Sequence, residues 1–285
     1  MGELLKGAPA ASAITDNLIE RASVLKGKNI HPCLAILRVG ERPDDLAYER
    51  GALNRCAKAG IAVRPFVLPE DAPQVQLMEA IDQINRDNTI HGCLMFLPLP
   101  RTLDEQAACA ALLPQKDVDG ITAGSMSRIY SGYGAGFAPC TAQSCLELLH
   151  YYGIAIPGKR AVVIGRSLVI GRPVAMLLMQ QNATVTICHT KTRNMEEIVR
   201  QADIVVVAAG QAEAIGPEYF RGGQVVLDVG INWSGEKQKL VGDVDFDRVL
   251  PIVSAISPVP AGVGSVTTAV LCMHVVEAAE KAAVS

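Results

Sequence analysis

Short apolar stretches alternate along this chain with segments of helical periodicity, and this alternation constrains the fold more than any other feature. In the first half the predicted strands are 33–39, 62–68 and 91–100, and the predicted helices are 45–59, 75–85 and 103–112. In the second half the predicted strands are 160–165, 183–189, 202–210 and 223–231, with helices between the first three and a last helix at about 266–282. Strands that alternate with helices indicate parallel sheets with right-handed crossovers. We therefore expect an α/β protein made of two doubly wound domains.

The stretch that joins the two halves, residues 121–141, is rich in Gly and Ser. It is predicted to be a long loop, of the kind that is usually functional, leading into a linking helix at 142–152. We place residues 1–141 in a first domain and 142–265 in a second. The last helix is expected to pack back on the first domain, so residues 266–285 are assigned to that domain.

Composition argues against several classes of protein. The formal net charge is −3 and no long basic run occurs, which argues against nucleic acid or an anionic membrane as the partner. No apolar run is long enough to span a bilayer, and the first residues lack the apolar segment of a secretory signal. The eight cysteines are scattered without a CxxC pair, which favours buried thiols in a reducing compartment over a metal site. We expect a cytoplasmic protein without a metal.

The helix predicted at 45–59 has an unusual surface. The residues that recur at helical spacing, and are therefore predicted to face the core, are Leu46, Leu53, Ala57 and Gly60. The residues predicted to turn away from the core are Tyr48, Ala52, Arg55 and Ala59. An aromatic side chain followed one turn later by alanine raises the question of whether this helix is scaffold or lines a site.

The strand predicted at 160–165 runs into "GRSLVIGRP", a glycine-containing turn before an apolar helix. Gly165 and Gly171 frame the turn, and Ser167 stands where the GxGxxG pattern has its middle glycine. Backbone N–H groups at the start of the helix are suited to bind a phosphate. An ordinary tight turn between strand and helix is the alternative.

The segment after the next strand, "TICHTKTRN", refines the expected cofactor. Dinucleotide domains usually carry an acid about 20 residues past the glycine loop, where it binds the ribose 2′-hydroxyl. No acid occurs here; Thr190, Lys191 and Arg193 take its place, with Arg166 in the glycine loop. A hydroxyl with positive charge suits a 2′-phosphate, so we expect NADP rather than NAD. The alternative is that Lys191 and Arg193 are solvated loop charges.

The segments "LPLP", "KDVDG", "PCT", "GRSxxxGRP", "VGDVDF" and "SPVPAGVG" occur in this order over nearly the whole chain. Together they resemble the methylenetetrahydrofolate dehydrogenase/methenyltetrahydrofolate cyclohydrolase family. The resemblance implies a folate cleft between the two domains, a C-terminal Rossmann-type domain that binds NADP or NAD, and a homodimer. It also implies an oxidoreductase of one-carbon metabolism that interconverts methylene- and methenyltetrahydrofolate by hydride transfer. Most members are multifunctional and also hydrolyse the methenyl form.

The same resemblance assigns roles to individual residues. Tyr48 matches a tyrosine that lies along the folate, and Asp119 matches the aspartate that binds the pterin. The implied folate contacts are Tyr48, Leu97, Pro98, Asp119, Pro258 and Gly262. The implied cofactor contacts are Gly165, Arg166, Ser167, Gly171, Arg172, Pro173, His189, Thr190 and Ile231. The alternatives are an edge-of-core aromatic for Tyr48 and a turn-capping carboxylate for Asp119.

The chain departs from the family pattern where hydrolysis takes place. The family's catalytic lysine, four residues after the tyrosine, is Ala52, and the glutamine that positions this lysine is Phe96. The two changes match, because a glutamine kept without its lysine would be a buried amide short of a partner. Ala261 and Ser265 also depart from the pattern. Arginines such as Arg55 stay protonated and are no substitute for a proton acceptor.

These departures lead to a specific expectation about activity. Hydride transfer needs alignment and a field that tolerates positive charge, whereas hydrolysis needs a general acid or base, whose loss typically lowers the rate about 10²–10⁴-fold. We expect an NADP-dependent methylenetetrahydrofolate dehydrogenase whose cyclohydrolase activity is weak or lost. Two other interpretations stay open: a catalytically silent paralogue that binds folate and nucleotide, and a dehydrogenase of a different cyclic substrate.

Overall fold

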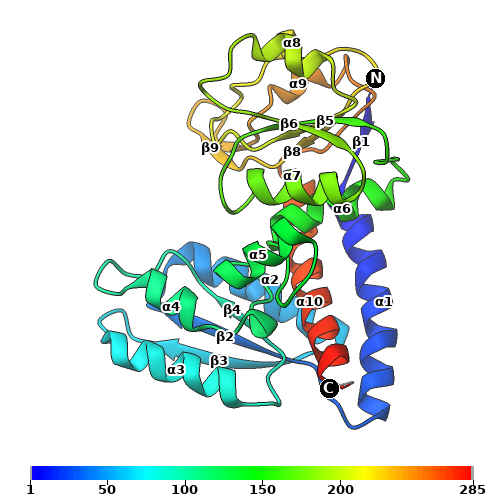
Figure 1. Cartoon of the computed structure of the whole chain (residues 1–285). Helices are drawn as coiled ribbons and strands as arrows, with labels where there is room; N and C mark the ends of the chain where they lie inside the picture. Colours follow the sequence, from blue (N-terminus) through cyan, green and yellow to red (C-terminus); the bar gives the residue numbers. More distant parts are fainter. Residues whose placement is uncertain (1, 284–285) are drawn as a thin grey trace. The chain divides into compact units, whose positions relative to one another are not determined.

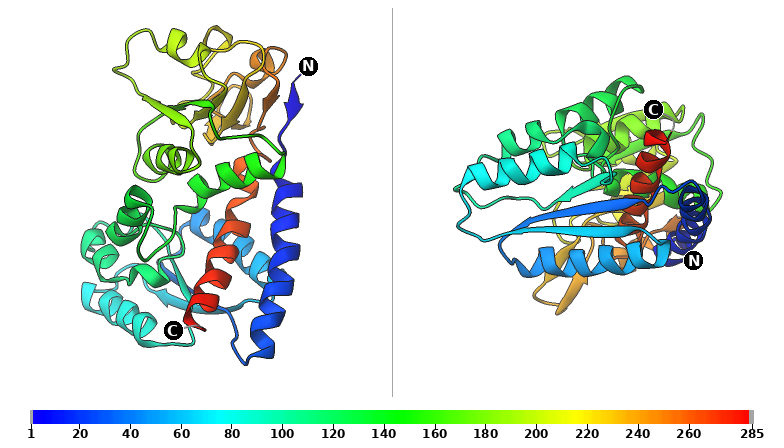
Figure 2. Two further views of the ribbon diagram at one scale, coloured as in Figure 1. Left: turned by 45° about the vertical axis from the view of Figure 1, so that its right-hand side comes forward. Right: turned by 90° about the horizontal axis from the view of Figure 1, so that it is seen from below.

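The structure is a computed structural model that describes residues 2–283, and the chain divides into two units. The three-stranded unit comprises residues 12–140 and 268–283, and the six-stranded unit comprises residues 2–11 and 141–267. Each unit has a parallel sheet with helices on both of its faces (Figures 1 and 2). The predicted class, an α/β protein with two doubly wound units, is confirmed.

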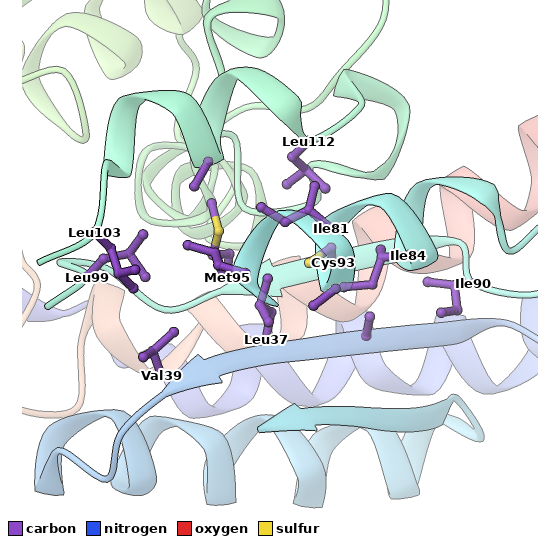
Figure 3. Packing of buried hydrophobic residues seen from close by; sticks show 14 of the residues in the cluster. Leu37, Val39, Ile81, Ile84, Ile90, Cys93, Met95, Leu99, Leu103 and Leu112 are labelled. Carbon is purple, nitrogen blue, oxygen red and sulfur yellow. The ribbon is translucent and has the colours of Figure 1, made fainter. Parts of the chain in front are cut away.

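The sheet of the three-stranded unit has β2 in its centre. Its order is β3 (Ala62–Leu68), β2 (Cys33–Val39), β4 (Gly92–Met95). Every residue of β2 is buried, and alternate side chains point to opposite faces of the sheet. One face carries Leu37, Val39 and Met95, which form a core with α3 (Gln74–Arg86) and α4 (Glu105–Ala111) (Figure 3).

Three helices, α1 (Gly7–Gly27), α2 (Pro43–Ala59) and α10 (Thr267–Ala282), cover the opposite face of this sheet. α1 and α10 run side by side in Figures 1 and 2, and Arg21 forms a 2.6 Å ion pair with Glu280 between them. α10 was predicted from the sequence, whereas α1 was not. The apolar face of α1 is made mostly of alanines, with Leu18 and Leu25 as its large buried members, so its periodicity is weak.

The six-stranded unit is built on one parallel sheet. Its order is β1 (Glu3–Leu4), β11 (Ala255–Ile256), β8 (Val225–Asp228), β7 (Ile204–Val207), β5 (Arg160–Ile164), β6 (Thr184–Cys188). α8 (Met195–Arg200) and α9 (Phe246–Val249) lie on one face, and α6 (Cys140–Tyr151) and α7 (Gly171–Gln180) on the other (Figure 1). An antiparallel ribbon, β9 (Asn232–Ser234) with β10 (Lys239–Val241), follows β8. Among the described residues no helix is long and apolar enough to cross a membrane.

Two local expectations need correction. The stretch 121–141 is not one long loop, because α5 (Ala123–Ser131) forms inside it, capped by the Thr122 side chain at its start and by Gly132 with φ 82° at its end. The beginning of the chain belongs to the six-stranded unit, since β1 pairs with β11 through Glu3–Ala255 and Leu4–Ile256. The expected linking helix is present as α6, and the strand expected at 91–100 ends at Met95.

Candidate active site

The inward face of α2 is the face that carries Tyr48 and Ala52. The buried residues of this helix are Asp45, Ala52, Cys56 and Ala59. Leu53, predicted to face the core, is 40% exposed, so the predicted orientation was wrong. Small side chains explain the difference, because they let α2 pack closely on α10, where Cys56 Sγ lies 3.6 Å from Cys272 Sγ. Large apolar residues are therefore a poor guide to the buried side of this helix.

Tyr48 meets Phe96 in an edge-to-face contact. The ring centroids are 6.1 Å apart and the ring planes make an angle of 86°. Phe96 follows β4 directly, its N–H donates to the Leu37 carbonyl over 3.0 Å, and its side chain is only 8% exposed. The contact places Tyr48 over the carboxyl end of β4, the edge at which parallel sheets commonly bind ligands.

Ala52 lies one helical turn beyond Tyr48 and is fully buried. A methyl group offers no proton donor or acceptor at this position. The guanidinium of Arg55 on the same helix donates to Thr15 Oγ1 over 2.9 Å, which ties it to α1. Arg55 is therefore not a substitute for an acid or base at Ala52, in agreement with its permanent charge.

A buried ion pair that was not predicted lies between β2 and α2. Arg38 Nε is 2.9 Å from Glu49 Oε2, the side chains are 8% and 12% exposed, and Arg38 also donates to the Gly40 carbonyl. Glu49 directly follows Tyr48 in α2, so the pair ties this helical turn to the end of β2. The sequence signal was the single arginine inside the apolar run "CLAILRV".

Asp117, and not Asp119, caps the turn in "KDVDG". Its carboxylate accepts hydrogen bonds from the Ile121 and Thr122 N–H groups over 3.0 and 2.7 Å and from Ser125 Oγ over 2.6 Å. None of these bonds involves Asp119, which removes the turn-capping alternative for that residue. Asp117 also bridges to Cys93 of β4 in parallel, so the chain runs on toward the edge of the sheet where Phe96 lies.

Asp119 is partly buried, and its carboxyl group changes protonation near neutral pH. Burial raises its pKa to about 7, the hydrogen bond with the Cys140 thiol opposes this rise, and the Asp117 charge adds to it. A carboxylate that burial has deprived of water is well suited to accept hydrogen bonds from the N–H groups of a ligand.

The other predicted folate contacts divide between the units. Leu97 and Pro98 follow Phe96 and are joined to each other by a cis peptide bond; Leu97 packs on the core, and the Pro98 carbonyl accepts a 3.0 Å hydrogen bond from Arg42. Tyr48, Leu97, Pro98 and Asp119 therefore all belong to the three-stranded unit, whereas Pro258 and Gly262 belong to the six-stranded unit. Ala261, beside Gly262, has φ 82°, a left-handed conformation that favours glycine.

The glycine turn after β5 has the close packing of a phosphate-binding turn. A Cβ at Gly165 would collide with the Ala208 carbonyl, and a Cβ at Gly171 would collide with the Gly165 carbonyl. Ser167 Oγ accepts hydrogen bonds from the N–H groups of Ile170 and Gly171 over 3.1 and 3.3 Å, and these bonds stabilise the start of α7. The chain leaves β5 toward β6 on one side and returns to β7 on the other, which makes this the switch point of the sheet.

The positive residues predicted to select the cofactor lie at the same edge of the sheet. β5 and β6 are parallel with Ile164 opposite Cys188, so Arg166 and the segment after Cys188 leave the sheet together. Thr190, Lys191 and Arg193 are exposed. The turn that carries them is held by His189, whose Nδ1 accepts the Lys191 N–H over 3.1 Å. Arg172 Nε donates to the Arg166 carbonyl over 3.1 Å, Pro173 is buried in α7, and Ile231 is exposed after β8.

Two buried carboxylates in the six-stranded unit were not predicted as functional residues: Asp243 stood only within the segment VGDVDF and Asp228 only within a predicted strand. The Asp243 carboxylate accepts hydrogen bonds from the N–H groups of Ala209, Gly210 and Gln211, over 2.6, 2.9 and 2.9 Å. These bonds hold the loop after β7 in place. Asp228 accepts the Asp243 N–H over 3.0 Å, and burial raises its pKa to about 7. Within residues 2–283 no group of three or more His, Cys, Asp or Glu residues is placed to hold a metal.

A parallel sheet with a glycine turn at its switch point, in a chain that has a second α/β unit, defines a two-domain α/β protein with a dinucleotide-binding domain. Residues 5–119 match the model of the tetrahydrofolate dehydrogenase/cyclohydrolase catalytic domain, and residues 139–283 match the NAD(P)-binding domain of that family. The chain therefore belongs to the tetrahydrofolate dehydrogenase/cyclohydrolase family.

Individual relatives agree with this assignment. The chain is 50% identical over 281 residues to the bifunctional protein FolD of Carboxydothermus hydrogenoformans, covering 98% of both chains. Its structure is similar to that of the bifunctional enzyme FolD from Campylobacter jejuni, with 37% identity, a TM-score of 0.94 and 99% of each chain covered. It is also similar to the Trypanosoma brucei enzyme complexed with NADP cofactor and inhibitor, with 33% identity, a TM-score of 0.91 and coverage of 100% and 99%.

Proposed function

We propose that this protein is an NADP-dependent methylenetetrahydrofolate dehydrogenase whose methenyltetrahydrofolate cyclohydrolase activity is weak or absent. The observation that carries the proposal is the pairing of Phe96 with Tyr48 beside the buried methyl group of Ala52. This arrangement keeps the tyrosine that the family resemblance places along the folate. It has neither of the two polar groups that the same resemblance assigns to hydrolysis.

The dehydrogenase half of the proposal is supported by the glycine turn and the residues around it. Gly165 and Gly171 allow the close backbone packing by which a glycine turn brings N–H groups together at the start of α7. The nicotinamide, when bound, supplies the hydride acceptor for the one-carbon bridge of the folate. This step asks the protein to align donor and acceptor and to tolerate positive charge, and it needs no proton acceptor from the chain.

The hydrolytic half fails in this account for lack of a proton-transfer group. Water attack on the methenyl form needs a group that removes or delivers a proton, and Ala52 has none. The aromatic edge of Phe96 cannot orient an ammonium or a water as an amide does. Loss of a general acid or base typically lowers a rate by about 10²–10⁴-fold, so hydrolysis would be weak.

The choice of NADP rests on charge. No acid follows β6 at the position suited to a ribose 2′-hydroxyl, and the exposed Lys191 and Arg193 follow that strand instead. No ion pair in residues 2–283 neutralises either cation. A 2′-phosphate is the ligand group that these charges suit.

Folate recognition is assigned to Tyr48 and Asp119. The tyrosine presents an aromatic surface for the folate, and the carboxylate of Asp119 offers two oxygens to the N–H edge of a pterin. Asp119 is available for this role because the neighbouring Asp117 caps the turn.

Initial rates of methylenetetrahydrofolate oxidation with NADP⁺ and with NAD⁺ test this function. The proposal predicts turnover with both and a higher kcat/KM with NADP⁺. Thermal unfolding with folate, pterin and NADP separates the alternatives, because a ligand that binds the folded state raises its apparent stability. Protection by folate without turnover would indicate a silent paralogue. If neither folate nor pterin protects the protein and the folate is not turned over, a different substrate is indicated.

We also propose a homodimer, on the family resemblance alone. Sedimentation equilibrium of the full chain measures this directly. A mass of twice 30.2 kDa is expected, and a single 30.2 kDa species at micromolar concentration would contradict it.

A further inference from the structure

A buried thiol beside Asp119 has a choice of hydrogen-bond acceptors. Cys140 Sγ lies 3.3 Å from the Val118 carbonyl oxygen and 3.8 Å from His274 Nδ1, and it also forms a hydrogen bond with the Asp119 side chain. A thiol has a single proton to donate. Its orientation therefore depends on which acceptor attracts the proton more strongly, and an acceptor that already has another donor attracts it less.

His274 supplies that other donor. Its Nδ1 lies 2.8 Å from the Val118 carbonyl oxygen, so Nδ1 carries the proton that makes this bond. The ring is 4% exposed and packs on Phe137 with centroids 4.9 Å apart. Burial, with the Arg128 and Lys281 charges, lowers the pKa of His274 to about 4 although the bond to Val118 opposes this, so the ring is neutral near pH 7.

The thiol itself stays protonated. Burial and the charge of Asp119 raise the pKa of Cys140 well above its usual range. The Val118 carbonyl already uses one of its two lone pairs for the stronger N–H donor, so the S–H proton goes preferentially to the Asp119 carboxylate, with which the hydrogen bond is charge-assisted. The charged group that acts on Asp119 is Asp117, from the same loop, whereas the neutral thiol acts on it through the hydrogen bond.

We propose that Cys140 and His274 are positioning residues for Asp119: the imidazole holds the Val118 carbonyl and thereby directs the Cys140 thiol proton to the Asp119 carboxylate. The hydrogen bond then fixes the orientation of the carboxylate and favours its ionised form, which burial disfavours. One oxygen lone pair is used by the thiol, and the others remain for N–H groups of a ligand. This inference rests on the proposed function, in which Asp119 binds the pterin.

The hydrogen bond is testable without turnover, through the infrared S–H stretching band of Cys140. The band is assigned as the one that disappears in Cys140→Ser and persists in Cys145→Ser, a matched buried thiol that bonds to the Thr141 carbonyl. We expect it to shift to lower frequency as Asp119 ionises near pH 7, and to be insensitive to pH in Asp119→Asn. A band that does not respond to pH in the unaltered protein would overturn the inference.

His274 variants test the direction of the thiol proton. His274→Asn keeps an amide donor for the Val118 carbonyl, and we expect the pH response of the band to persist. His274→Leu removes the donor, so the thiol proton turns to Val118 and the response is lost. Equal responses in both variants would assign His274 a packing role only and refute its part in the proposal.

Kinetics give an independent reading. Cys140→Ala removes the donor that stabilises the ionised carboxylate, so the pH midpoint of kcat/KM for the folate should rise by up to about one unit, with kcat changed much less than KM. Cys140→Ser supplies a stronger donor and should return the midpoint to its original value or lower. Absence of any turnover would refute the proposed function and leave the infrared test intact, whereas turnover with identical midpoints in all variants would refute the positioning role.

Discussion

Phe96 meets Tyr48 edge to face, with 6.1 Å between ring centroids, at the carboxyl end of β4. Such pairs add about 0.5–1.5 kcal/mol beyond the burial of the two rings. The contact therefore helps to orient the tyrosine. In the proposed function it also links the two positions where the resemblance implies polar groups, since Ala52 lies one turn beyond Tyr48 on the same helix.

Restoring both polar groups should restore hydrolysis. We expect Ala52→Lys combined with Phe96→Gln to raise the rate of methenyltetrahydrofolate decay by about 10²-fold or more, because the pair supplies a proton-transfer group and an amide to orient it. Ala52→Lys alone should gain less and should lower the melting temperature, since Ala52 is fully buried. The matched control is Ala57→Lys, which adds the same group on the exposed side of α2. Equal hydrolysis in the control and the double variant would contradict the assignment.

The buried pair of Arg38 and Glu49 should be strongly coupled. Arg38→Met leaves the Glu49 carboxylate buried without its partner, and we expect a loss of about 3–5 kcal/mol in the free energy of unfolding. Adding Glu49→Gln should recover most of this loss, because the uncompensated charge is then removed. Urea unfolding of the four proteins in the double-mutant cycle measures the coupling. Additive losses in the two single variants would show that the pair is not coupled.

The affinity for the folate should depend on pH through Asp119. Its pKa of about 7 means that the carboxyl becomes protonated as the pH falls through neutrality. The ionised form accepts hydrogen bonds from ligand N–H groups, so KM should rise below pH 7 by up to about tenfold per unit. Asp119→Asn should bind folate weakly and without this pH dependence. A KM that stays constant between pH 5.5 and 8.5 in the unaltered protein would contradict the role of Asp119.

The preference for NADP should depend on the cations that follow β6. We expect Lys191→Gln with Arg193→Gln to raise KM for NADP⁺ by about tenfold or more and to leave KM for NAD⁺ nearly unchanged, because charge-assisted bonds to a phosphate are lost. Lys159→Gln is the control, since Lys159 is exposed and precedes β5 at the opposite end of that strand. Parallel changes with both cofactors would refute the assignment of these cations to the 2′-phosphate.

Asp243 should matter for the cofactor through the loop after β7. Asp243→Asn places an amide N–H₂ among the N–H groups of Ala209, Gly210 and Gln211, and at least one hydrogen bond is lost. We expect a destabilisation of about 1–3 kcal/mol and a raised KM for the cofactor. Asp247→Asn, at an exposed position in α9, is the control. An unchanged melting temperature and KM in Asp243→Asn would show that the loop does not depend on this carboxylate.

The α/β class and most element positions were predictable because buried parallel strands are continuous apolar runs. β2 and β3 begin and end at the predicted residues. α1 was missed because its buried face consists largely of small side chains, whose periodicity is weak. The orientation of α2 was predicted wrongly for the same reason: Ala52, Cys56 and Ala59 pack inward while Leu53 is exposed. Close helix packing selects small residues, which a search for large apolar residues overlooks.

Site residues could be predicted where a sequence motif reflects a requirement of the backbone conformation. They were harder to predict where their role depends on a contact with a residue distant in the sequence. Gly165 and Gly171 were recognised from spacing, and the structure gives both a steric reason. The contacts of Arg38 with Glu49, and of Cys140 with His274, join residues 11 and 134 positions apart. Nothing in the local sequence specifies such partners, because they are set by how the helices cover the sheet.

The central claim is that oxidation of the folate is retained while hydrolysis is not. One experiment on the purified protein tests it most directly: NADPH formation from methylenetetrahydrofolate is followed together with the decay of supplied methenyltetrahydrofolate. The account predicts NADPH formation at an enzymatic rate, with methenyl decay no faster than in buffer. Methenyl decay accelerated to a rate comparable with NADPH formation would contradict it.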